Sequence, residues 1–432
     1  MTTSTTLPAP YTVMRGGVLV IAVLATVMAL IENSGFWYWV VPDGDTANSL
    51  RPLSGPFRML LRLVLLLSIL GAFGLGRFAL IKKVLVTLAP LLPFFLFGLL
   101  AMVWSISKVE SAKYLINWIL VCGGLAAASS QMSPDLLRRV LVTVFLSCVG
   151  SSFVAYIVVP DIATGYHYGN PVMRGLFVHK NTFGYFSALG GLVLVALGRH
   201  KTLPGLAALA LLWAGVMASG SAAALAVGVT GTLYVLVLRL VVPHRQFHLP
   251  FVVIVLAVTA LSALTLIFAL EWVTGLMGRS ATLSGRTFLW QGYLDHFGNR
   301  IVLGQGAGLF TTLNARGLDI TGSVAGSGGV GLPHNLYIAL LGEVGFVGLL
   351  LFVGGHLWIM LVSPFRKNSE WAVMASGLSF IILLRALAED GDGYHLSVAF
   401  IMIVLARGQI ASRDGRLLPR HLRRPRQAAP QL

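Results

Sequence analysis

The sequence predicts an all-α integral membrane protein, with about 12 transmembrane helices in one bundle. Of its residues, 56% are hydrophobic and only 11% are charged, and the mean hydropathy is +0.84. This composition is too apolar for a soluble core of this length. Apolar residues also run continuously rather than alternating, which argues against a membrane β-barrel.

The predicted spans follow one another along the whole chain. Each is long enough, or nearly so, to cross ~30 Å of hydrocarbon as a helix. They cover residues 14–31, 57–76, 84–104, 111–130, 136–159, 181–198, 203–218, 221–242, 249–270, 335–362, 371–388 and 394–406. The last span is short, and the pair between 203 and 242 can be divided differently. Because no repeat or linker interrupts the series, we expect residues 1–432 to form a single polytopic domain.

The charged residues sort to opposite sides of the predicted bundle. If the N-terminus is cytoplasmic, 19 of the 31 lysines and arginines lie in cytoplasmic segments, and 12 of the 15 acidic residues lie outside or at outer helix ends. This follows the positive-inside rule and predicts an even number of spans with both termini cytoplasmic. The basic segment 407–432 is then a cytoplasmic tail that contacts anionic lipid, and no nucleic acid is expected as a partner despite the net charge of +16.

Neither the N-terminus nor the cysteines predict processing or redox chemistry. The N-terminus lacks a basic cluster and a small-residue cleavage site, so we expect the first span to remain as a signal anchor. Cys122 and Cys148 both fall inside predicted helices. We interpret them as small apolar residues rather than as a disulfide or a metal-binding pair.

Three outer loops are long enough to carry a functional site. They comprise residues 32–56, 161–180 and the large loop 271–333 between the ninth and tenth spans. Within the large loop, Phe288, Leu289, Tyr293 and Phe297 recur at helical spacing and predict a short amphipathic helix. The stretches "LGQGAGLF" and "GSVAGSGGVGLPHN" predict flexible or tightly turned backbone.

Several outer segments carry cations and polar groups on a side that is otherwise rich in acidic residues. They are Arg174 with His179, Lys180 and Asn181; Ser219 with Ser221; Arg286; and His334 with Asn335. Taken singly, each has a structural explanation, because a lone arginine at a helix end reaches lipid phosphate and a lone histidine or asparagine caps a helix. Taken together at one membrane face, they predict a site for a phosphate or pyrophosphate on a lipid.

Four motifs in order resemble a known membrane family. "RGLFVHKNTFG", "SGRTFLW", "GQGAGLF" and "PHNLYIALLGEVGFVGLLLF", at these intervals, resemble the O-antigen ligases and Wzy-type polymerases, most closely the exopolysaccharide polymerases. The resemblance covers mainly residues 170–360. It implies a polyprenol-dependent, GT-C-like glycosyltransferase in the bacterial inner membrane. It also implies metal-independent, inverting transfer from an undecaprenyl-pyrophosphate-linked glycan to a sugar hydroxyl, at the periplasmic face.

Roles for the candidate residues follow from this resemblance together with their chemistry. We expect Arg286, as a catalytic residue, and Arg174 to bind and stabilise the pyrophosphate with help from Lys180, while His179 and Asn181 position it or cap the sixth span. His334 is the expected base or acceptor-positioning group, with Asn335 as its neighbour. Glu343 is interpreted as a buried partner or an interhelical hydrogen-bonding group. "GEVGFVG", which contains Glu343, is interpreted as helix packing.

No metal or cofactor is expected, because no acidic or histidine cluster on the outer side has metal-ligand spacing. The acid-dense stretch "EDGDG", residues 389–393, is interpreted as an outer loop rather than a cation site.

The chain departs from the family pattern at one position. Many ligases of this family carry an arginine just after a small-residue pair, where this chain has Ala222. Arg174 is our expected substitute, and the absence favours an exopolysaccharide polymerase over an O-antigen ligase that joins glycan to lipid A core.

Two other classes remain as alternatives. A polysaccharide or anion transporter is disfavoured, because the predicted spans are clean and carry no repeat and no charges at mid-membrane. A purely structural partner leaves the outer arginines unexplained. For an enzyme, the expected partners are the lipid-linked glycan donor, a glycan or lipid-linked acceptor, the bilayer, a flippase and a chain-length co-polymerase.

Overall fold

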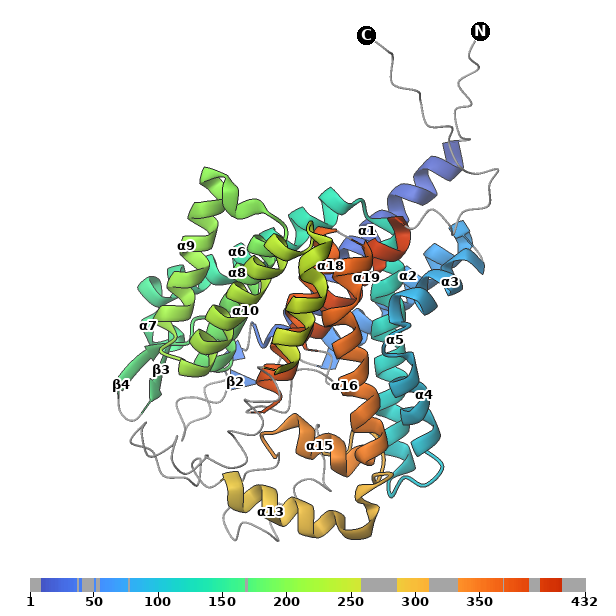
Figure 1. Cartoon of the computed structure of the whole chain (residues 1–432). Helices are drawn as coiled ribbons and strands as arrows, with labels where there is room; N and C mark the ends of the chain where they lie inside the picture. Colours follow the sequence, from blue (N-terminus) through green and yellow to red (C-terminus); the bar gives the residue numbers. More distant parts are fainter. Residues whose placement is uncertain are drawn as a thin grey trace.

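The computed structural model describes an almost entirely helical molecule (Figure 1). It describes residues 9–36, 39–40, 50–51, 55–76, 78–167, 170–257, 286–310, 333–367, 369–387 and 397–413. Two small antiparallel hairpins accompany the helices. One pairs β1 (Trp39–Val40) with β2 (Leu50–Arg51), and the other pairs β3 (Thr164–His167) with β4 (Asn170–Met173).

The longer helices account for most of the predicted spans. They are α1 (Ala9–Ser34), α2 (Gly55–Gly76), α3 (Phe78–Leu88), α4 (Leu92–Ala101), α5 (Lys108–Gln131), α6 (Pro134–Val158), α8 (Lys180–Ala196), α9 (Leu203–Ala218), α10 (Ala222–Val241), α13 (Arg286–Phe297), α15 (Leu336–Glu343), α16 (Gly345–Leu361), α18 (Glu370–Arg385) and α19 (Val398–Arg413). Short helical turns occur at α7 (Pro160–Ala163), η1 (Arg199–Lys201), η2 (Arg245–Phe247), η4 (Gly298–Ile301) and α17 (Ser363–Lys367).

Hydroxyl side chains cap the N-termini of several of these helices. Ser133, Thr202, Ser221 and Ser369 accept hydrogen bonds from the backbone N–H three residues on, at the starts of α6, α9, α10 and α18. Such caps satisfy backbone donors that have no partner within the helix. The long apolar runs are thereby divided at defined points into separate helices.

Six helices among the described residues are long and apolar enough to cross a membrane: α1, α2, α5, α6, α10, and α16 together with the turn α17. The shorter helices, such as α8, α9, α18 and α19, have 16 or 17 residues. The protein is therefore an all-helical membrane protein, and the count of about 12 spans stays a prediction.

Two predicted spans are wrong as continuous helices. The span predicted over 84–104 is split into α3 and α4, which meet at an angle of 94° around Pro90. The span predicted over 335–362 is split into α15 and α16 at Gly345, whose φ is +66°. A side chain there would lie 2.3 Å from the Val302 carbonyl oxygen, so the break requires glycine. The sequence argument against a transporter assumed uninterrupted spans, and that assumption is therefore also wrong.

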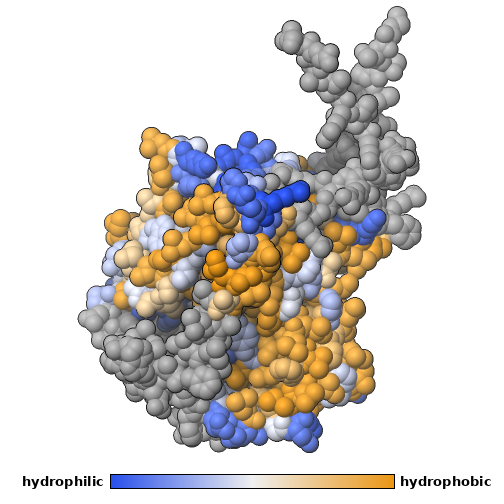
Figure 2. All heavy atoms as spheres, viewed as in Figure 1, coloured by the Kyte–Doolittle hydropathy of each residue, from blue (hydrophilic) through white to orange (hydrophobic). Residues whose placement is uncertain are grey.

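The two ends of the bundle differ in character. Figure 1 shows α1 beginning and α19 ending at one end, while β3, β4, α13 and α15 lie at the other. In Figure 2 a broad hydrophobic surface separates hydrophilic groups at the two ends. An apolar belt of this kind is what a bilayer covers, and we call the end with β3, β4, α13 and α15 the outer end, following the charge distribution.

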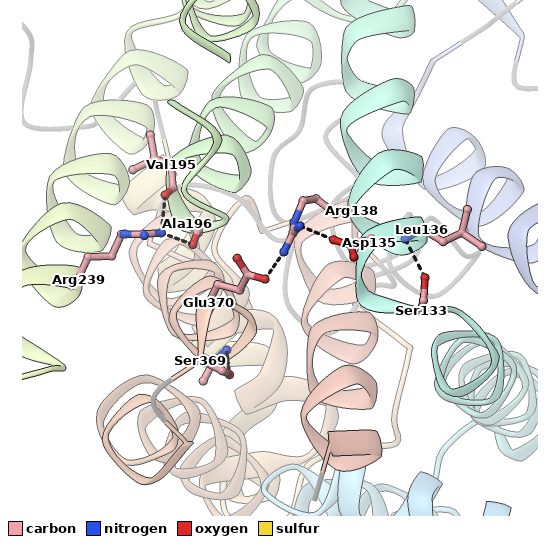
Figure 3. A network of polar contacts seen from close by, with 10 residues as sticks. Ser133, Asp135, Leu136, Arg138, Val195, Ala196, Arg239, Ser369 and Glu370 are labelled. Carbon is pink, nitrogen blue, oxygen red and sulfur yellow. Dashed lines mark hydrogen bonds and ion pairs between the residues drawn. The ribbon is translucent and has the colours of Figure 1, made fainter. Parts of the chain in front are cut away.

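Basic residues at the opposite end hold neighbouring helices together (Figure 3). The Arg138 guanidinium on α6 pairs with Asp135 and reaches Glu370 at the start of α18. Arg239 near the end of α10 donates to the carbonyl oxygens of Val195 (3.0 Å) and Ala196 (2.7 Å), which end α8. These arginines therefore bind helix ends to one another in addition to any contact with lipid.

Arg407 corrects the predicted boundary of the basic tail. It lies within α19 and its side chain is buried, with Nε and Nη2 donating to the carbonyl oxygens of Thr87 and Val86 on α3. The sequence placed it in a lipid-contacting tail because it is the first arginine after the last apolar run. It is instead a buried contact between two helices.

The centre of the bundle consists of α8, α18 and α19, whose side chains are almost all buried. Small residues make close packing possible there. Cys122 and Cys148 are buried free thiols within helices, which confirms their interpretation as apolar packing residues.

Candidate functional site

The candidate site lies where α8, α13, α15 and α18 meet at the outer end of the bundle. α8 and α15 begin there, α18 ends there, and α13 lies against α15 across that end (Figure 1). The candidate residues fall on these elements because each sits at a helix end or in the loop just before it.

The start of α15 carries the most unusual backbone in the site. His334 has a φ of +49°, and it is the one non-glycine residue among the described residues with a positive φ. Left-handed backbone is costly for a residue with a Cβ, so such an outlier indicates a functional or packing requirement. Asn335 follows as the N-cap of α15, and its Oδ1 accepts from the backbone N–H of Tyr337 (3.0 Å) and Ile338 (3.2 Å).

Three hydrogen bonds tie this start of α15 to the end of α18. The backbone N–H of Leu336 donates to the Ala386 carbonyl oxygen at 2.9 Å, and Asn335 Nδ2 donates to the Leu387 carbonyl oxygen at 3.3 Å. The Tyr337 hydroxyl donates at 2.7 Å to the carbonyl oxygen of Leu383, which lies on α18 about one helical turn before Leu387. His334 is therefore held next to the last turn of α18.

That last turn presents Arg385, which the sequence reasoning missed. Its guanidinium carbon lies 3.6 Å from the centre of the Tyr185 ring on α8, a cation–π contact that joins α18 to α8. Its position in the sequence could have marked Arg385 as a candidate site residue. Arg385 is a cation at the outer end of a span, on the side where most charges are acidic, and four residues before "EDGDG". The "EDGDG" stretch itself lies outside the described residues.

The start of α8 places Lys180 in the interior of the site. Lys180 is only 5% exposed, and its Nζ donates to the Gly220 carbonyl oxygen at 3.3 Å, in the turn between α9 and α10. His179 is the N-cap of α8, and its Nδ1 accepts from the backbone N–H of Asn181 at 3.1 Å. The capping role foreseen for this pair is thus confirmed, while binding of a ligand by His179, Lys180 or Asn181 stays a prediction.

Arg174 is packed more deeply than a lipid-contacting arginine. It is 8% exposed, its Nε donates to the Ile162 carbonyl oxygen at 3.0 Å, and its aliphatic stem packs on Gly165. Burial lowers the pKa of the Arg174 guanidinium from its usual value. Arg174 therefore braces the β3–β4 hairpin with one nitrogen, and its expected contact with pyrophosphate has to use the others.

The short helix predicted in the large loop is confirmed as α13, with Arg286 as its first residue. The Arg286 side chain lies outside what the structure describes. Its helix is anchored by Trp290, whose Nε1 donates to the Pro333 carbonyl oxygen at 2.8 Å, next to His334. Leu289, Tyr293 and Phe297 are buried against Phe310 and Ala339, so α13 packs on α15.

The "GQGAGLF" stretch is tightly turned rather than flexible. Gly304, Gly306 and Gly308 all have positive φ. The Glu343 carboxylate is fully buried and accepts from the backbone N–H of Gly308 at 2.8 Å and of Phe310 at 2.7 Å. Glu343 is thus a buried partner, as the sequence suggested, and its partner is this glycine turn rather than a neighbouring helix.

Taken together, the contacts place His334, Asn335, Arg385, Tyr185 and the start of α13 in one region. Lys180 lies at the same end of the bundle, where its Nζ donates to the Gly220 carbonyl oxygen. Among the described residues, no three His, Cys, Asp or Glu side chains gather as metal ligands would. Cationic groups and a strained histidine at a membrane surface suit a ligand that carries negative charge at the bilayer boundary.

Comparison with known families identifies the central part of the chain. Residues 207–353 match the family model described as O-Antigen ligase. This segment is therefore similar to the O-antigen ligase family, which supports the resemblance seen in the sequence. A search of the curated proteins gives no match.

The matched segment of the O-antigen ligase family holds only part of the candidate site. It includes α10, α13 and α15, with Arg286, His334 and Asn335. Arg174, Lys180 and Arg385 lie outside it, on elements that the bundle brings to the same end. The match of this segment points to polysaccharide polymerase or ligase activity, of a glycosyltransferase-like class.

Proposed function

We propose that this protein transfers a glycan from undecaprenyl pyrophosphate to a sugar hydroxyl at the periplasmic face of the bacterial inner membrane. Its products are polymerised exopolysaccharide or O-antigen repeat units. The observation that carries this proposal is the meeting of His334, held in left-handed backbone, with the cations of α8 and α18 at one end of the bundle. The match of residues 207–353 to the O-antigen ligase family model supports the reaction class.

The proposed reaction is a direct displacement at the anomeric carbon. The acceptor hydroxyl oxygen attacks that carbon from the face opposite the pyrophosphate, the new C–O bond forms, and the bond to the pyrophosphate oxygen breaks with inversion. His334 takes the proton of the attacking hydroxyl, and general-base help of this kind contributes about 10²- to 10⁴-fold to rate. Arginine and lysine stabilise the negative charge that develops on the departing pyrophosphate.

Arg385 is our revised candidate for the cation that Ala222 does not supply. α10 begins at Ala222 and packs against α18, which runs in the opposite direction and ends at Arg385. A cation from α18 therefore reaches the end of the bundle where α10 starts. Arg174, the substitute expected from sequence, already uses Nε to hold the Ile162 carbonyl oxygen, so Arg385 is the better candidate.

A polymerase is favoured over an O-antigen ligase, because this chain has Ala222 where many ligases have arginine. The two activities are separated by the glycans of a deletion strain. Loss of polymer with single repeat units remaining indicates a polymerase. Lipid-linked polymer that never reaches its acceptor indicates a ligase instead.

Transport of a polysaccharide or another anion is the second candidate, and the 94° bend between α3 and α4 favours it, because broken helices are common in transporters. Proteoliposomes distinguish the two. Uptake of a labelled anionic glycan without any change in its covalent structure would indicate transport. Elongated glycan with release of undecaprenyl pyrophosphate would indicate the enzyme.

The direct test uses purified protein with an undecaprenyl-pyrophosphate-linked repeat unit in excess chelator. We expect turnover without added divalent metal, since cationic side chains take the place of a metal ion. His334→Ala should lower the rate by about 10²-fold or more while donor binding changes little. Arg58→Lys is the matched control, because Arg58 is an exposed arginine paired with Glu32 and lies on α2, which is not one of the helices that form the site. Abolition of turnover by chelator, with rescue by one cation, would contradict the proposal.

A further inference from the structure

A groove with a volume of about 560 Å³ lies between α1 and α6. Its floor and walls are almost entirely apolar. They come from one face of each helix: Val23, Val27 and Ile31 of α1, and Val140, Val144 and Cys148 of α6. Both helices are long and apolar enough to span the membrane. In a bilayer such a groove is filled by a hydrocarbon chain, because water finds few polar partners there.

The length of the groove matches a chain from one leaflet. On α6 it extends from Arg139 through Thr143 and Ser147 to Ser151, four residues apart on a single helix face. Twelve residues of α-helix rise about 18 Å, a little more than half of the ~30 Å hydrocarbon core. Ser151 Oγ donates to the Cys148 carbonyl oxygen, so its hydroxyl is satisfied within the helix. The groove thus accommodates an ordinary acyl chain rather than one that crosses the bilayer.

The charge at one end of the groove indicates what the chain is attached to. Arg139 lines that end and its side chain is exposed. Its neighbour Arg138 is neutralised by Asp135 and Glu370, whereas within the described part of the chain no acidic side chain pairs with Arg139. An exposed guanidinium beside an apolar groove is complementary to a phosphodiester with an attached acyl chain.

We propose that this groove is a binding site for an anionic phospholipid, with one acyl chain between α1 and α6 and the phosphate on Arg139. The Arg139 end of the groove lies at the end of the bundle that carries the basic loops, while Phe36 lines its other end and contacts Phe177. It is independent of the proposed function, because none of its residues belongs to that site. An anionic lipid bound there joins α1 to α6 along a seam where the two helices leave a space.

The test measures the thermal stability of delipidated protein in detergent while dioleoyl phosphatidylglycerol or dioleoyl phosphatidylcholine is added. Phosphatidylglycerol should raise the unfolding midpoint of the wild-type protein more strongly than phosphatidylcholine. Arg139→Gln should weaken the apparent affinity for phosphatidylglycerol about fivefold, the factor equivalent to ~1 kcal/mol for one cation near an anionic head group. Ser147→Phe should abolish the effect of both lipids by filling the groove.

Two control variants separate the groove from general effects. Lys82→Gln removes an exposed cation of the same end of the bundle, and Val154→Phe enlarges an exposed side chain of α6 outside the groove. Both should respond to phosphatidylglycerol as the wild type does. Native mass spectrometry should show one retained phosphatidylglycerol on the wild-type protein and none on Ser147→Phe. Equal responses to the two lipids, or an unchanged response of Arg139→Gln and Ser147→Phe, would overturn the proposal.

Discussion

The carboxylate of Glu343, at the end of α15, holds the backbone N–H groups of Gly308 and Phe310 at 2.8 and 2.7 Å. Gly308 and Phe310 precede Glu343 by 35 and 33 residues in sequence, and the Glu343 carboxylate is fully buried. A buried charge is tolerated only when its hydrogen bonds are satisfied, and here two backbone donors satisfy it. Glu343 thus attaches the large outer loop to the helix that follows the candidate base.

Removing this carboxylate should loosen the loop. Hydrogen bonds to a charged group contribute about 1.5–3 kcal/mol each, so Glu343→Ala should lower the free energy of unfolding by about 3 kcal/mol or more. A cysteine introduced at the buried Leu309 should react with a maleimide faster in the Glu343→Ala background. Glu110→Ala, which removes an exposed carboxylate paired with Lys113, should leave both readings unchanged. Equal labelling rates in the two variants would argue against the attachment.

His334 is predicted to trade stability for activity. Glycine adopts a φ of +49° without the strain that a side chain imposes, about 1–2 kcal/mol per residue. His334→Gly should therefore unfold at the same temperature as the wild type or higher, while turnover falls by about 10²-fold or more. His334→Ala should lose activity to the same extent but without the gain in stability.

Glycan transfer and thermal unfolding are measured in parallel on each variant, to show whether the turnover rate and the unfolding temperature change independently. His179→Ala serves as the comparison, because His179 has extended backbone and caps α8 through Nδ1. It should lose stability and keep more of the rate. A His334→Gly protein that still transfers glycan within a few-fold of the wild-type rate would show that the histidine is not the base.

Sequence predicted the class of fold better than it predicted individual contacts. The helix α13 was predictable because Leu289, Tyr293 and Phe297 repeat at helical spacing, and they are indeed buried on one face. The caps at His179 and Asn335 were also predictable, because each side chain accepts from the backbone N–H two residues later in the sequence.

The contacts that sequence did not predict depend on distant segments. Arg385 meets Tyr185 across 200 residues because α18 and α8 pack side by side, and neither residue lies in a recognisable motif. The breaks at Pro90 and Gly345 interrupt apolar runs whose composition alone reads as continuous spans. Arg407 looked like part of a basic tail because its carbonyl partners on α3 are 320 residues away.

Arg407 is therefore predicted to be a structural residue. It crosses from α19 to α3 and donates to the carbonyl oxygens of Thr87 and Val86, which end α3 before the bend. Arg407→Ala leaves these buried acceptors without a donor and should destabilise the protein by about 3 kcal/mol, measured by thermal unfolding in detergent. Lys82→Gln, an exposed change on the same helix as Thr87, should have an effect within about 0.5 kcal/mol. A similar shift for both variants would mean that Arg407 acts only through surface charge.

The orientation of the bundle is testable at residues on its two ends. His200 lies in the turn η1 beside Arg199 and Lys201, and Asp161 lies in α7 before the β3–β4 hairpin. The positive-inside distribution predicts that a cysteine at 200 is cytoplasmic and one at 161 is periplasmic. In intact cells with a permeable outer membrane, a membrane-impermeant maleimide should label the Asp161→Cys protein and spare His200→Cys until the cells are lysed. The opposite pattern would reverse the bundle and place the candidate site in the cytoplasm.

The contact between Arg385 and Tyr185 provides the most direct test of the cation that we assign to the donor pyrophosphate. A guanidinium 3.6 Å above an aromatic ring is held in place by the ring, and its planar fork matches two phosphate oxygens as a lysine ammonium does not. Arg385→Lys should therefore raise the KM for the lipid-linked donor about tenfold or more. Tyr185→Phe keeps the ring and should behave as the wild type, whereas Tyr185→Leu removes the ring and should raise KM in the same direction as Arg385→Lys.

Steady-state kinetics on the purified variants, with unfolding temperatures measured in parallel, separate donor binding from folding. If Tyr185→Leu and Arg385→Lys both keep the wild-type KM, Arg385 only fastens α18 to α8, and the pyrophosphate is bound by the cations of α8 and α13.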